Sequence, residues 1–538
     1  MFVHALSVIT LSVQTVAAEV PAPQDSIRAQ AAREDILQLG DLLERVHPDP
    51  FEGFGGRVAY SRAFQSLVDD LPDGWVHVAD LRRRIGRFLG DMGDGHTGLS
   101  LASGTSGGGE QRYLPVRLTT SSDGIVISDA LGAHQDLLGA RVDSVEGRSV
   151  DDLARATRVF RPSENLPGSR RQLARSLEGV HLVREILPDV GRRLRLTVTR
   201  PGAGGPEEVT LAYERSADDW RAGPWPMAQV DRVGPDVGPF NHRMIADGRV
   251  GYLRLRAMWS REAFESMRAA GRTDLDQWLT YAYDRYMDGP KPPDVVEGID
   301  AFPSLIDEVD ALLRSMREHD ARDVIVDLRA NGGGFSVIGE PLLYQLFGDA
   351  YLRAPDPVFF ATRVSAELLS IRGKTLADLS REEGREVRLG DFTFDPSSTA
   401  AGEGVEEFLQ RLRDKGFSRV DALAGVAQEP GLHVVALTDA ATFSAAFDLT
   451  YHLHRMGAVL VGVSPSQSPR AFTDATPFVL TNSGLGGSMS RTAVVYPGIP
   501  SEDGAVVLDL PLTWARWAEH GFHPDAAVQM AVELLRRR

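Results

Sequence analysis

The stretch from Gly431 to Gly457 constrains the fold most, because a buried strand, a polar break and an amphipathic helix follow one another there. Leu432–Thr438 is short and mostly apolar, which suits the centre of a sheet. After the break Asp439–Phe443, apolar residues recur at three- and four-residue spacing and predict one helix face. Ser444 is therefore expected where the turn ends and the helix begins.

Two interpretations of Ser444 are open at this point. In the first, the serine is only an N-cap, whose hydroxyl accepts a hydrogen bond from an orphan backbone N–H. In the second, it is a nucleophile, since the helix dipole favours developing negative charge. The free N–H of Ala445 would then point at an oxyanion.

A second strand-to-turn segment, Asp323–Phe335, contains three consecutive glycines. Glycines at 332–334 leave backbone amides uncovered, where no side chain can intrude. The segment lacks the Gly-Lys-Ser/Thr signature of a phosphate-binding loop. It is either a plain glycine-rich turn or the other half of an oxyanion hole, with Gly332 and Gly333 as candidate donors.

Five segments in order carry a family resemblance: GDGHTGLS, GARVDSVEGRSVDDL, DLRANGGG, TFSAAFDL and LTNSGL. Together they resemble the tail-specific, or C-terminal processing, serine peptidases, from about His47 to the C-terminus. The resemblance implies an α/β fold with a ClpP/crotonase-like catalytic core. It also implies an N-terminal helical region and a PDZ-like β-rich domain.

In the tricorn-like branch of this family, a histidine is the general base, and His96 matches it. An acidic residue of that branch matches Glu502, with Asp503 as a substitute. Without the resemblance, His96 would be interpreted as an ordinary solvated histidine in a turn. Glu502 would be interpreted as an ordinary solvated glutamate in a loop. The chain departs from the branch at Gly95, where a serine precedes the histidine, and from the family at Phe447, where a glutamate is frequent.

The dyad branch of the family uses a lysine after the serine. This chain has only three lysines, Lys291, Lys374 and Lys415, and all of them precede Ser444. The nearest cation beyond the serine's helix is Arg470, and arginine cannot act as a base at physiological pH. The composition therefore favours a serine–histidine pair over a serine–lysine dyad.

The composition limits the remaining classes of function. A net charge of −17 excludes general affinity for nucleic acid or an anionic membrane. The absence of cysteine excludes disulfides, thiolate catalysis and cysteine-ligated metals. There is no HExxH motif, and His452 and His454 are too close in sequence to share one helix face. We therefore predict no metal and no organic cofactor.

A chain of 538 residues is expected to hold about two to four domains. Phe2–Ala18 is apolar, too short to span a bilayer with polar flanks, and ends in small residues. It predicts a signal peptide and a periplasmic or secreted protein, although His4 is its only candidate cation and a truncated start is the alternative. The expected regions are a signal peptide at 1–18, a helical region at 26–105, a PDZ-like domain at 111–215, a linker at 216–244 and a catalytic core at 245–538 with insertions at 260–303 and 350–424.

The predicted reaction is peptide hydrolysis through an acyl-enzyme on Ser444, with His96 as general base and Glu502 orienting it. The expected substrate is a peptide or an unfolded protein. The PDZ-like domain would either gate the active site or present the peptide as a strand added to a sheet edge. Two alternatives remain: a catalytically inactive peptide-binding protein on a peptidase fold, and an esterase of small molecules. The sequence does not indicate an oligomeric state.

Overall fold

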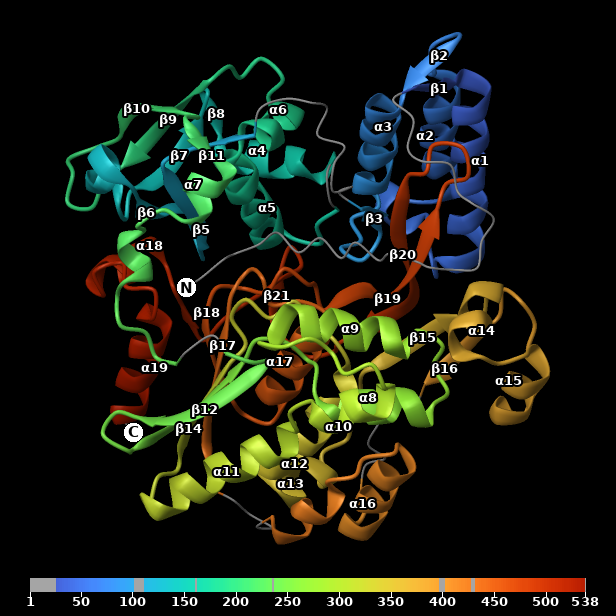
Figure 1. Cartoon of the computed structure of the whole chain (residues 1–538), viewed down its shortest axis with the longest axis vertical. Helices are drawn as coiled ribbons and strands as arrows, with labels where there is room; N and C mark the ends of the chain where they lie inside the picture. The colour runs from blue at the N-terminus through green and yellow to red at the C-terminus, as the bar shows by residue number, and fades with distance from the viewer. Residues whose placement is uncertain are drawn as a thin grey trace.

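The computed structural model describes residues 26–100, 111–159, 162–234, 237–395, 402–426 and 431–537. Two smaller parts, one helical and one β-rich, lie side by side above a larger α/β part (Figure 1). The predicted signal peptide at 1–18 lies outside the described residues. Within them, no helix is both long enough and apolar enough to cross a membrane.

The N-terminal part is mainly helical. Its elements are β1 (Ser26–Arg28), α1 (Ala29–Val46), η1 (Glu52–Phe54), α2 (Arg57–Asp69), β2 (Trp75–His77) and α3 (Val78–Asp91). Helix α1 ends at Val46 because the next residue, His47, is extended and precedes a proline. Apolar residues of α1 and α3 pack on Phe478, Leu480 and Met489 from the far end of the chain. The N-terminal part is thus fixed to the C-terminal half by its own core.

The β-rich part follows. Its main sheet has the order β10-β9-β7-β6-β5, with β8 paired to β7. The elements of this part are β4 (Arg112–Tyr113), β5 (Val116–Ser121), β6 (Gly124–Ala130), η2 (Gly132–Leu137), β7 (Arg141–Val145), β8 (Arg148–Ser149), α4 (Val150–Ala156), η3 (Thr157–Val159), α5 (Leu166–Glu178), α6 (Val180–Ile186), β9 (Arg193–Thr199), β10 (Glu207–Ala212) and β11 (Arg215–Ser216). The strands and helices of this part pack around one hydrophobic core of their own.

Helix α5 ends in a buried acid that gives this part a pH dependence. The Glu178 carboxylate accepts a hydrogen bond from the Leu118 N–H at 2.8 Å. Burial raises the pKa of Glu178 to about 7, against the opposing effects of that hydrogen bond and of Arg175 and Arg117. Burial raises the pKa of the neighbouring Tyr113, and the charge of Glu178 raises it too.

We expect the wild type to lose stability as the pH rises from 5 to 8. In the unfolded chain Glu178 is already largely ionised at the start of this range, whereas the folded protein still holds the proton and loses it only as the pH rises. The folded pKa lies above the unfolded one, so its stabilising share is complete below the unfolded pKa and disappears through about pH 7. The loss is on the order of 1–3 kcal/mol. Glu178→Gln should lack it. Thermal unfolding of both proteins at the two pH values measures the difference, and equal pH dependence would contradict it.

The predicted linker at 216–244 contains structure of its own: α7 (Ala217–Arg221), η4 (Pro226–Ala228) and the start of β12 (Phe240–Ile245). Trp220 and Trp225 are buried together against Leu131 of the β-rich part. The segment is therefore anchored at its beginning and becomes an edge strand of the next sheet at its end. The sequence did not predict that strand.

The mostly parallel sheet of the α/β part has the order β12-β13-β14-β17-β18-β23, in which all pairs are parallel except β12 with β13. Its remaining strands are β13 (Val250–Leu255), β14 (Asp323–Asp327), β17 (His433–Thr438), β18 (Val459–Gly462) and β23 (Leu510–Pro511). Alternate residues face opposite layers. Leu253 and Val326 pack toward α11 (Leu305–Glu318), α12 (Gly339–Phe347) and α17 (Ala445–Arg455).

The other face of this sheet is covered by α19 (Ala526–Arg536), which lies on the opposite side from α12 and α17 (Figure 1). Tyr252, Ile325 and Val435 pack there. The sheet is thus covered on both faces, as parallel sheets require. The carboxyl ends of β13, β14 and β17 meet at one edge, where ligands bind in sheets of this kind.

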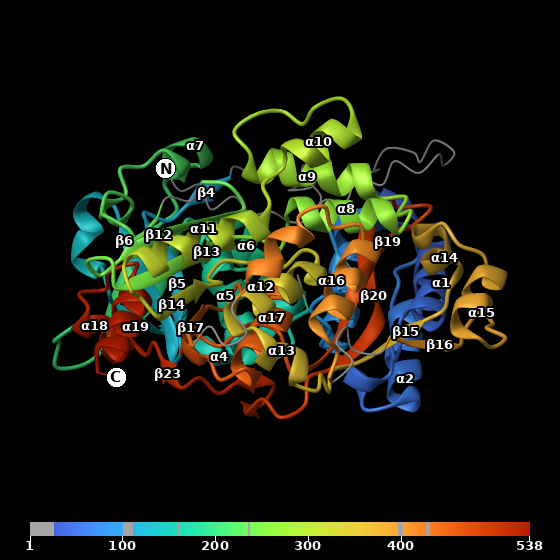
Figure 2. The ribbon, with the colours of Figure 1, turned by 90° about the horizontal axis from the view of Figure 1, so that it is seen from below.

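The two predicted insertions are structured. Residues 260–303 form α8 (Arg261–Ala269), α9 (Leu275–Tyr286) and α10 (Val295–Ala301), which lie together in Figure 2. Residues 350–424 continue from α13 (Asp349–Arg353) into β15 (Phe359–Arg363), α14 (Ala366–Arg372), α15 (Leu376–Glu383), β16 (Phe392–Asp395), α16 (Val405–Asp414) and η6 (Val420–Gly425).

A second sheet, of order β16-β15-β20-β19, joins the later insertion to the C-terminal hairpin. The hairpin strands are β19 (Arg470–Val479) and β20 (Gly486–Val495). The short strand β3 (Gly98–Leu99) of the N-terminal part pairs with β20. This pairing brings the GDGHT loop to the core. The remaining short elements are η5 (Ser336–Ile338), β21 (Ser501–Glu502), β22 (Ala505–Val506) and α18 (Trp514–Glu519).

Candidate active site

Ser444 lies in a sharp turn between β17 and α17. Its backbone has φ 57° and ψ −128°, a conformation that normally belongs to glycine. Its side chain caps no backbone N–H of α17, so the N-cap interpretation does not hold. Its own N–H donates to Gln467 Oε1 at 2.7 Å. A strained serine that presents its hydroxyl at the start of a helix has the geometry of a nucleophile.

The glycine loop after β14 lies directly against this serine. A Cβ added to Gly333 would lie 2.7 Å from the Ser444 Cβ and 3.1 Å from the Ala445 nitrogen. A Cβ on Gly334 would lie 2.4 Å from the Met258 oxygen. The two glycines also have positive φ values, 103° and 148°. Only glycine fits here, and the loop backbone is held in contact with Ser444.

The backbone N–H groups of this loop differ in what they bind. The Gly333 N–H donates to Asn331 Oδ1 at 2.9 Å, so that predicted oxyanion donor is already engaged. Among the described residues, no acceptor is recorded for the N–H of Ala445 or of Gly332. Gly332 is exposed and Ala445 is buried at the helix start. Two of the three predicted donors therefore remain available.

A buried ionic network fixes the base of the glycine loop. The Asp327 carboxylate accepts a hydrogen bond from the Tyr252 hydroxyl at 2.6 Å and pairs with Arg254 and Arg329 at 2.7 and 2.6 Å. Burial raises the pKa of Asp327, but the two guanidinium groups outweigh burial and hold it well below its usual range. Arg329 continues to Asp525 at 3.1 Å. The loop is thus tied to the start of α19.

His96 reaches this site from the N-terminal part. Its ring stacks on Phe443, the residue before the serine, with ring centroids 4.4 Å apart and planes at 28°. Its backbone N–H donates to Asp94 Oδ1 at 2.9 Å, and its carbonyl accepts from the Ser488 hydroxyl at 3.0 Å. The His96 side chain is 10% exposed. The predicted base and nucleophile, 348 positions apart, are therefore brought to adjacent places by β3 and β20.

A buried carboxylate underlies the histidine loop. Asp94 Oδ2 accepts from His47 Nε2 at 3.1 Å, from the Ser490 hydroxyl at 2.7 Å and from the Thr97 hydroxyl. Burial raises the pKa of Asp94, but the hydrogen bond and the charge from His47 lower it by more. The pKa of Asp94 therefore lies below its usual value. Asp94 thus remains ionised and holds the loop rigid.

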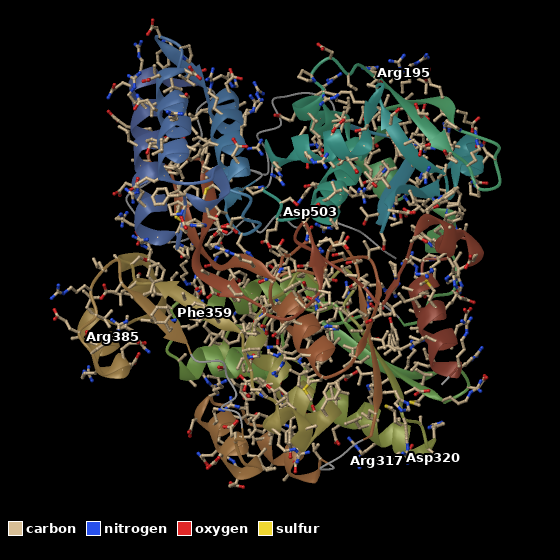
Figure 3. All side chains as sticks on the ribbon, turned by 180° about the vertical axis from the view of Figure 1, so that it is seen from behind. Arg195, Arg317, Asp320, Phe359, Arg385 and Asp503 are labelled. Carbon is tan, nitrogen blue, oxygen red and sulfur yellow. The ribbon has the colours of Figure 1, made fainter. Side chains whose placement is uncertain are left out.

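The acid beside His96 is Glu164, where the sequence predicted Glu502. The His96 Nδ1 atom lies 3.9 Å from Glu164 Oε1, and the Glu164 side chain is 3% exposed. Glu502 lies on β21, paired with Ala505 in a tight hairpin, and its side chain is exposed. No ion pair joins it to His96 among the described residues. Asp503, the substitute, is exposed at the hairpin turn (Figure 3).

Glu164 is held by backbone donors from two other segments. The Gly95 N–H donates to Oε1 at 3.2 Å and the Ser468 N–H to Oε2 at 2.8 Å. Burial and the charge of Asp94 nevertheless raise the pKa of Glu164 well above its usual range. The protonated form of Glu164 is therefore favoured relative to that of a solvated glutamate. A cation on His96 would favour the ionised form instead.

The departure at Gly95 has a steric reason. A Cβ at this position would lie 2.7 Å from the Phe443 ring and 2.9 Å from Glu164 Oε1. A serine there would not fit without displacing the acid or the ring on which the histidine stacks. The backbone N–H of Gly95 bonds the acid in place of a side chain.

Asp94, His96 and Glu164 each offer a donor atom within 4.8 Å of the others, which is a spacing that metal ligands can have. The Asp94 oxygens, however, are already used by His47, Ser490, Thr97 and the loop backbone. We therefore describe the group as an acid–imidazole cluster and assign no ion to it.

Two residues of the site carried no sequence signal. Glu164 lies between η3 and α5, next to the N-cap Asn165, in a stretch without any motif. Gln467 lies in the serine- and proline-rich loop after β18. Neither spacing nor residue type distinguishes them from ordinary loop residues, and only the tertiary fold brings them to Ser444 and His96.

No protein-family model and no curated protein matches the sequence. Solved structures do match the fold. Mature CPAF is similar with a TM-score of 0.53 at 16% identity, over 94% of this chain and 96% of that chain. Mature CPAF complexed with lactacystin gives the same TM-score and identity over 94% and 98%. The photosystem II D1 C-terminal processing protease gives 0.39 at 12% identity, over 92% and 98%. The likeness to mature CPAF shows a common fold.

Proposed function

We propose that this chain is a serine peptidase of the tail-specific kind, with Ser444 as nucleophile and His96 as general base. The observation that carries the proposal is the conformation of Ser444. A non-glycine residue at φ 57° and ψ −128°, with a glycine backbone pressed against it, is strain of the kind that folds keep at functional sites. The His96 ring stacked on the preceding residue supplies the base.

In the proposed reaction, the Ser444 oxygen attacks the carbonyl carbon of the scissile peptide bond. His96 takes the hydroxyl proton on Nε2, the ring nitrogen away from Glu164, and returns it to the leaving amine as the C–N bond breaks. Water then hydrolyses the acyl-enzyme by the reverse proton path. The N–H groups of Ala445 and Gly332 stabilise the oxyanion.

Glu164, rather than Glu502, orients the histidine in this proposal. The 3.9 Å between His96 Nδ1 and Glu164 Oε1 is an ion-pair distance, longer than a hydrogen bond. Catalytic hydrogen bonds are often long before substrate binds and tighten in the complex. Once the imidazolium forms, its charge favours the ionised carboxylate, which accepts a hydrogen bond from Nδ1–H while that proton stays on the ring.

The architecture fits the same proposal. We propose that the mostly parallel sheet with α12 and α17 is a ClpP/crotonase-like core, and that the β-rich part is a PDZ-like domain that contacts peptide or unfolded protein. The fold shared with mature CPAF supports this assignment. Export to the periplasm or the exterior stays a prediction, because residues 1–18 lie outside the described part.

A fluorophosphonate probe tests the nucleophile directly. The full-length protein should be labelled, and mass spectrometry of the digested protein should find the label on Ser444. Ser66→Ala, a change of an exposed serine on α2, serves as the control and should be labelled as fast as the wild type. Mature CPAF has been crystallised with lactacystin, so lactacystin is a competitor to try. An unlabelled protein would favour an inactive peptide-binding fold.

Replacing all three lysines by arginine should leave peptide cleavage within about twofold of the wild type. Each lysine is already used in an ion pair: Lys291 with Asp276, Lys374 with Glu382, and Lys415 with Glu340. Arginine can keep these pairs but cannot act as a base. Initial rates on an unstructured peptide measure the effect. A large loss of rate in a folded triple variant would assign the base to a lysine.

A further inference from the structure

The helical N-terminal part holds a groove outside the candidate active site. It is a cavity of about 610 Å³ between the end of α2, the strand β2 and one face of α3. Ligand sites in proteins commonly have volumes of this size. β2 and the upper end of α3 lie at the top of Figure 1, at the end of this part that points away from the α/β part. The proposed reaction uses none of the residues that line the groove.

One wall of the groove is an open strand edge. The Ala29 N–H donates to the Gly74 carbonyl at 2.8 Å. Arg28 and Trp75, the next residues on β1 and β2, are therefore a non-hydrogen-bonded pair of the ladder. Since such pairs alternate with bonded ones, the backbone groups of Trp75 and of His77 both point away from β1.

The backbone groups on this edge are available. Among the described residues, no backbone partner is recorded for the Trp75 N–H, the Trp75 carbonyl or the His77 N–H. All three residues of β2 line the groove, so the open edge borders the cavity. An edge of this kind binds an extended peptide, which adds to it as a further strand.

The groove also offers apolar surface for the side chains of such a peptide. Leu67 of α2 and Phe88 of α3 line it and are otherwise buried in the core of the N-terminal part. Trp75 is 56% exposed, and the Arg28 guanidinium lies 4.0 Å from the centre of its ring. A large exposed aromatic beside an apolar floor is typical of a binding surface.

The charges of the rim leave one cation without a partner. Three arginines and three aspartates of α2 and α3 line the groove. Arg83 pairs with Asp80 and lies 3.9 Å from Glu185 of α6. Arg84 is half-buried, and no hydrogen bond or ion pair among the described residues includes it. A guanidinium in this position is suited to a carboxylate, which it can bind through two N–H groups.

We infer that this groove is a further peptide-binding site, which takes an extended peptide segment with an acidic side chain. The segment's backbone pairs with the open edge of β2, its apolar side chains pack on Leu67 and Phe88, and its carboxylate pairs with Arg84. The groove follows α3 from Asp80 to Asp91, about 16 Å, which about five extended residues span.

The inference goes beyond the proposed function, because it concerns binding and not cleavage. Helix α3 ends at Asp91, and the loop that follows it carries His96. In the proposed peptidase, the groove would hold a segment of the substrate away from the scissile bond. Only this last step rests on the proposed function.

Fluorescence anisotropy with the full-length Ser444→Ala protein tests the site, because this variant should leave a bound peptide uncut. The probe is an octapeptide of alternating valine and glutamate, with fluorescein at its N-terminus and an amide at its C-terminus. A matched probe has lysine in place of glutamate. The glutamate probe should bind about tenfold more tightly, the size of one charge-assisted hydrogen bond.

Arg84→Gln, made in the same protein, tests the acidic preference. It should weaken binding of the glutamate probe about tenfold and change that of the lysine probe by less than about twofold. Arg62→Gln is the matched control, since Arg62 is an exposed arginine of α2 that does not line the groove. It should change neither affinity.

His77→Pro and His77→Ala test the strand edge. His77 has φ −69°, which proline adopts. Both variants lose the Nδ1 atom that accepts the Ala79 N–H at 3.3 Å, but only the proline variant also loses the backbone N–H. His77→Pro should therefore bind both probes about fivefold more weakly than His77→Ala does, the size of one backbone hydrogen bond.

The outcomes separate the parts of the inference. No saturable binding of either probe would overturn the site. Equal affinity for the two probes, or an unchanged affinity in Arg84→Gln, would overturn the acidic preference, and equal affinities of the two His77 variants would overturn backbone pairing. Thermal midpoints check folding, and Arg84→Gln still tests the site if His77→Pro does not fold. A protein that binds the probe but is not labelled at Ser444 would overturn the proposed function alone.

Discussion

Ser444→Ala is expected to lower kcat for an unstructured peptide by on the order of 10⁶-fold, the loss that follows removal of a serine nucleophile. The fold should survive, because the Ser444 side chain caps no N–H of its helix. Circular dichroism and the thermal midpoint check the fold, and a fluorogenic peptide checks the rate. Ser66→Ala is the control. If Ser444→Ala cleaved the peptide at a rate near that of the wild type, Ser444 would not be the nucleophile.

A second substitution at the same position tests the strain. Ser444→Gly should be as inactive as the alanine variant but more stable than the wild type by about 1 kcal/mol, because glycine adopts φ 57° without a steric cost. Ser365 is the matched comparison, since it also precedes a helix but accepts the Leu368 N–H at 3.1 Å. Ser365→Gly should not gain stability. A loss of stability in Ser444→Gly would contradict the strain.

The contrast between these two serines explains how far sequence reasoning reaches. The strand, turn and helix around Ser444 are local, so the order of apolar residues predicts β17 and α17 nearly to their ends. Whether the serine caps its helix depends on backbone angles imposed by Gln467 and the glycine loop. Those contacts join distant segments, and spacing along the chain does not encode them.

The glycine loop after β14 shows the same limit at the level of single atoms. Three glycines in a row predict exposed amides, and the loop does lie against Ser444. The Asn331 side chain then binds the Gly333 N–H, which leaves the Gly332 N–H as the candidate donor of this loop. Which amide is left over follows from one rotamer of one asparagine. In the same way, β15 lies in a predicted insertion, and its pairing with β20 is not evident from the sequence because Thr362 and the opposite residue, Thr492, are 130 positions apart.

The acid was predicted from family resemblance, and the tertiary structure points elsewhere. Glu164→Gln is expected to lower kcat by about 10²-fold with a smaller change in KM, because the carboxylate acts on the imidazolium of the transition state. Glu502→Gln should leave both constants unchanged, since its side chain is exposed on β21. Glu178→Gln, a buried change of the same kind in the β-rich part, is the control and should leave kcat unchanged.

The pH dependence gives this prediction a second, independent readout. Burial and the charge of Asp94 raise the pKa of Glu164, and His96 and Tyr496 are the other titratable groups that face it. Wild-type kcat should therefore rise with pH as Glu164 ionises and becomes an acceptor for His96. Glu164→Gln resembles the protonated acid at every pH, so its profile should lack that limb and stay on a low plateau.

Stability should move in the opposite direction. The folded pKa of Glu164 lies above its unfolded value, so its stabilising share is complete below the unfolded pKa and disappears as the pH rises through the folded one. Alkaline pH should thus cost the wild type stability that Glu164→Gln keeps, while only the wild type gains activity. A buried acid that orients the histidine should make kcat rise with pH while the stability of the protein falls. A surface glutamate should produce neither of these two changes. A kcat that falls in Glu502→Gln, with Glu164→Gln unchanged in both measurements, would return the orienting role to Glu502.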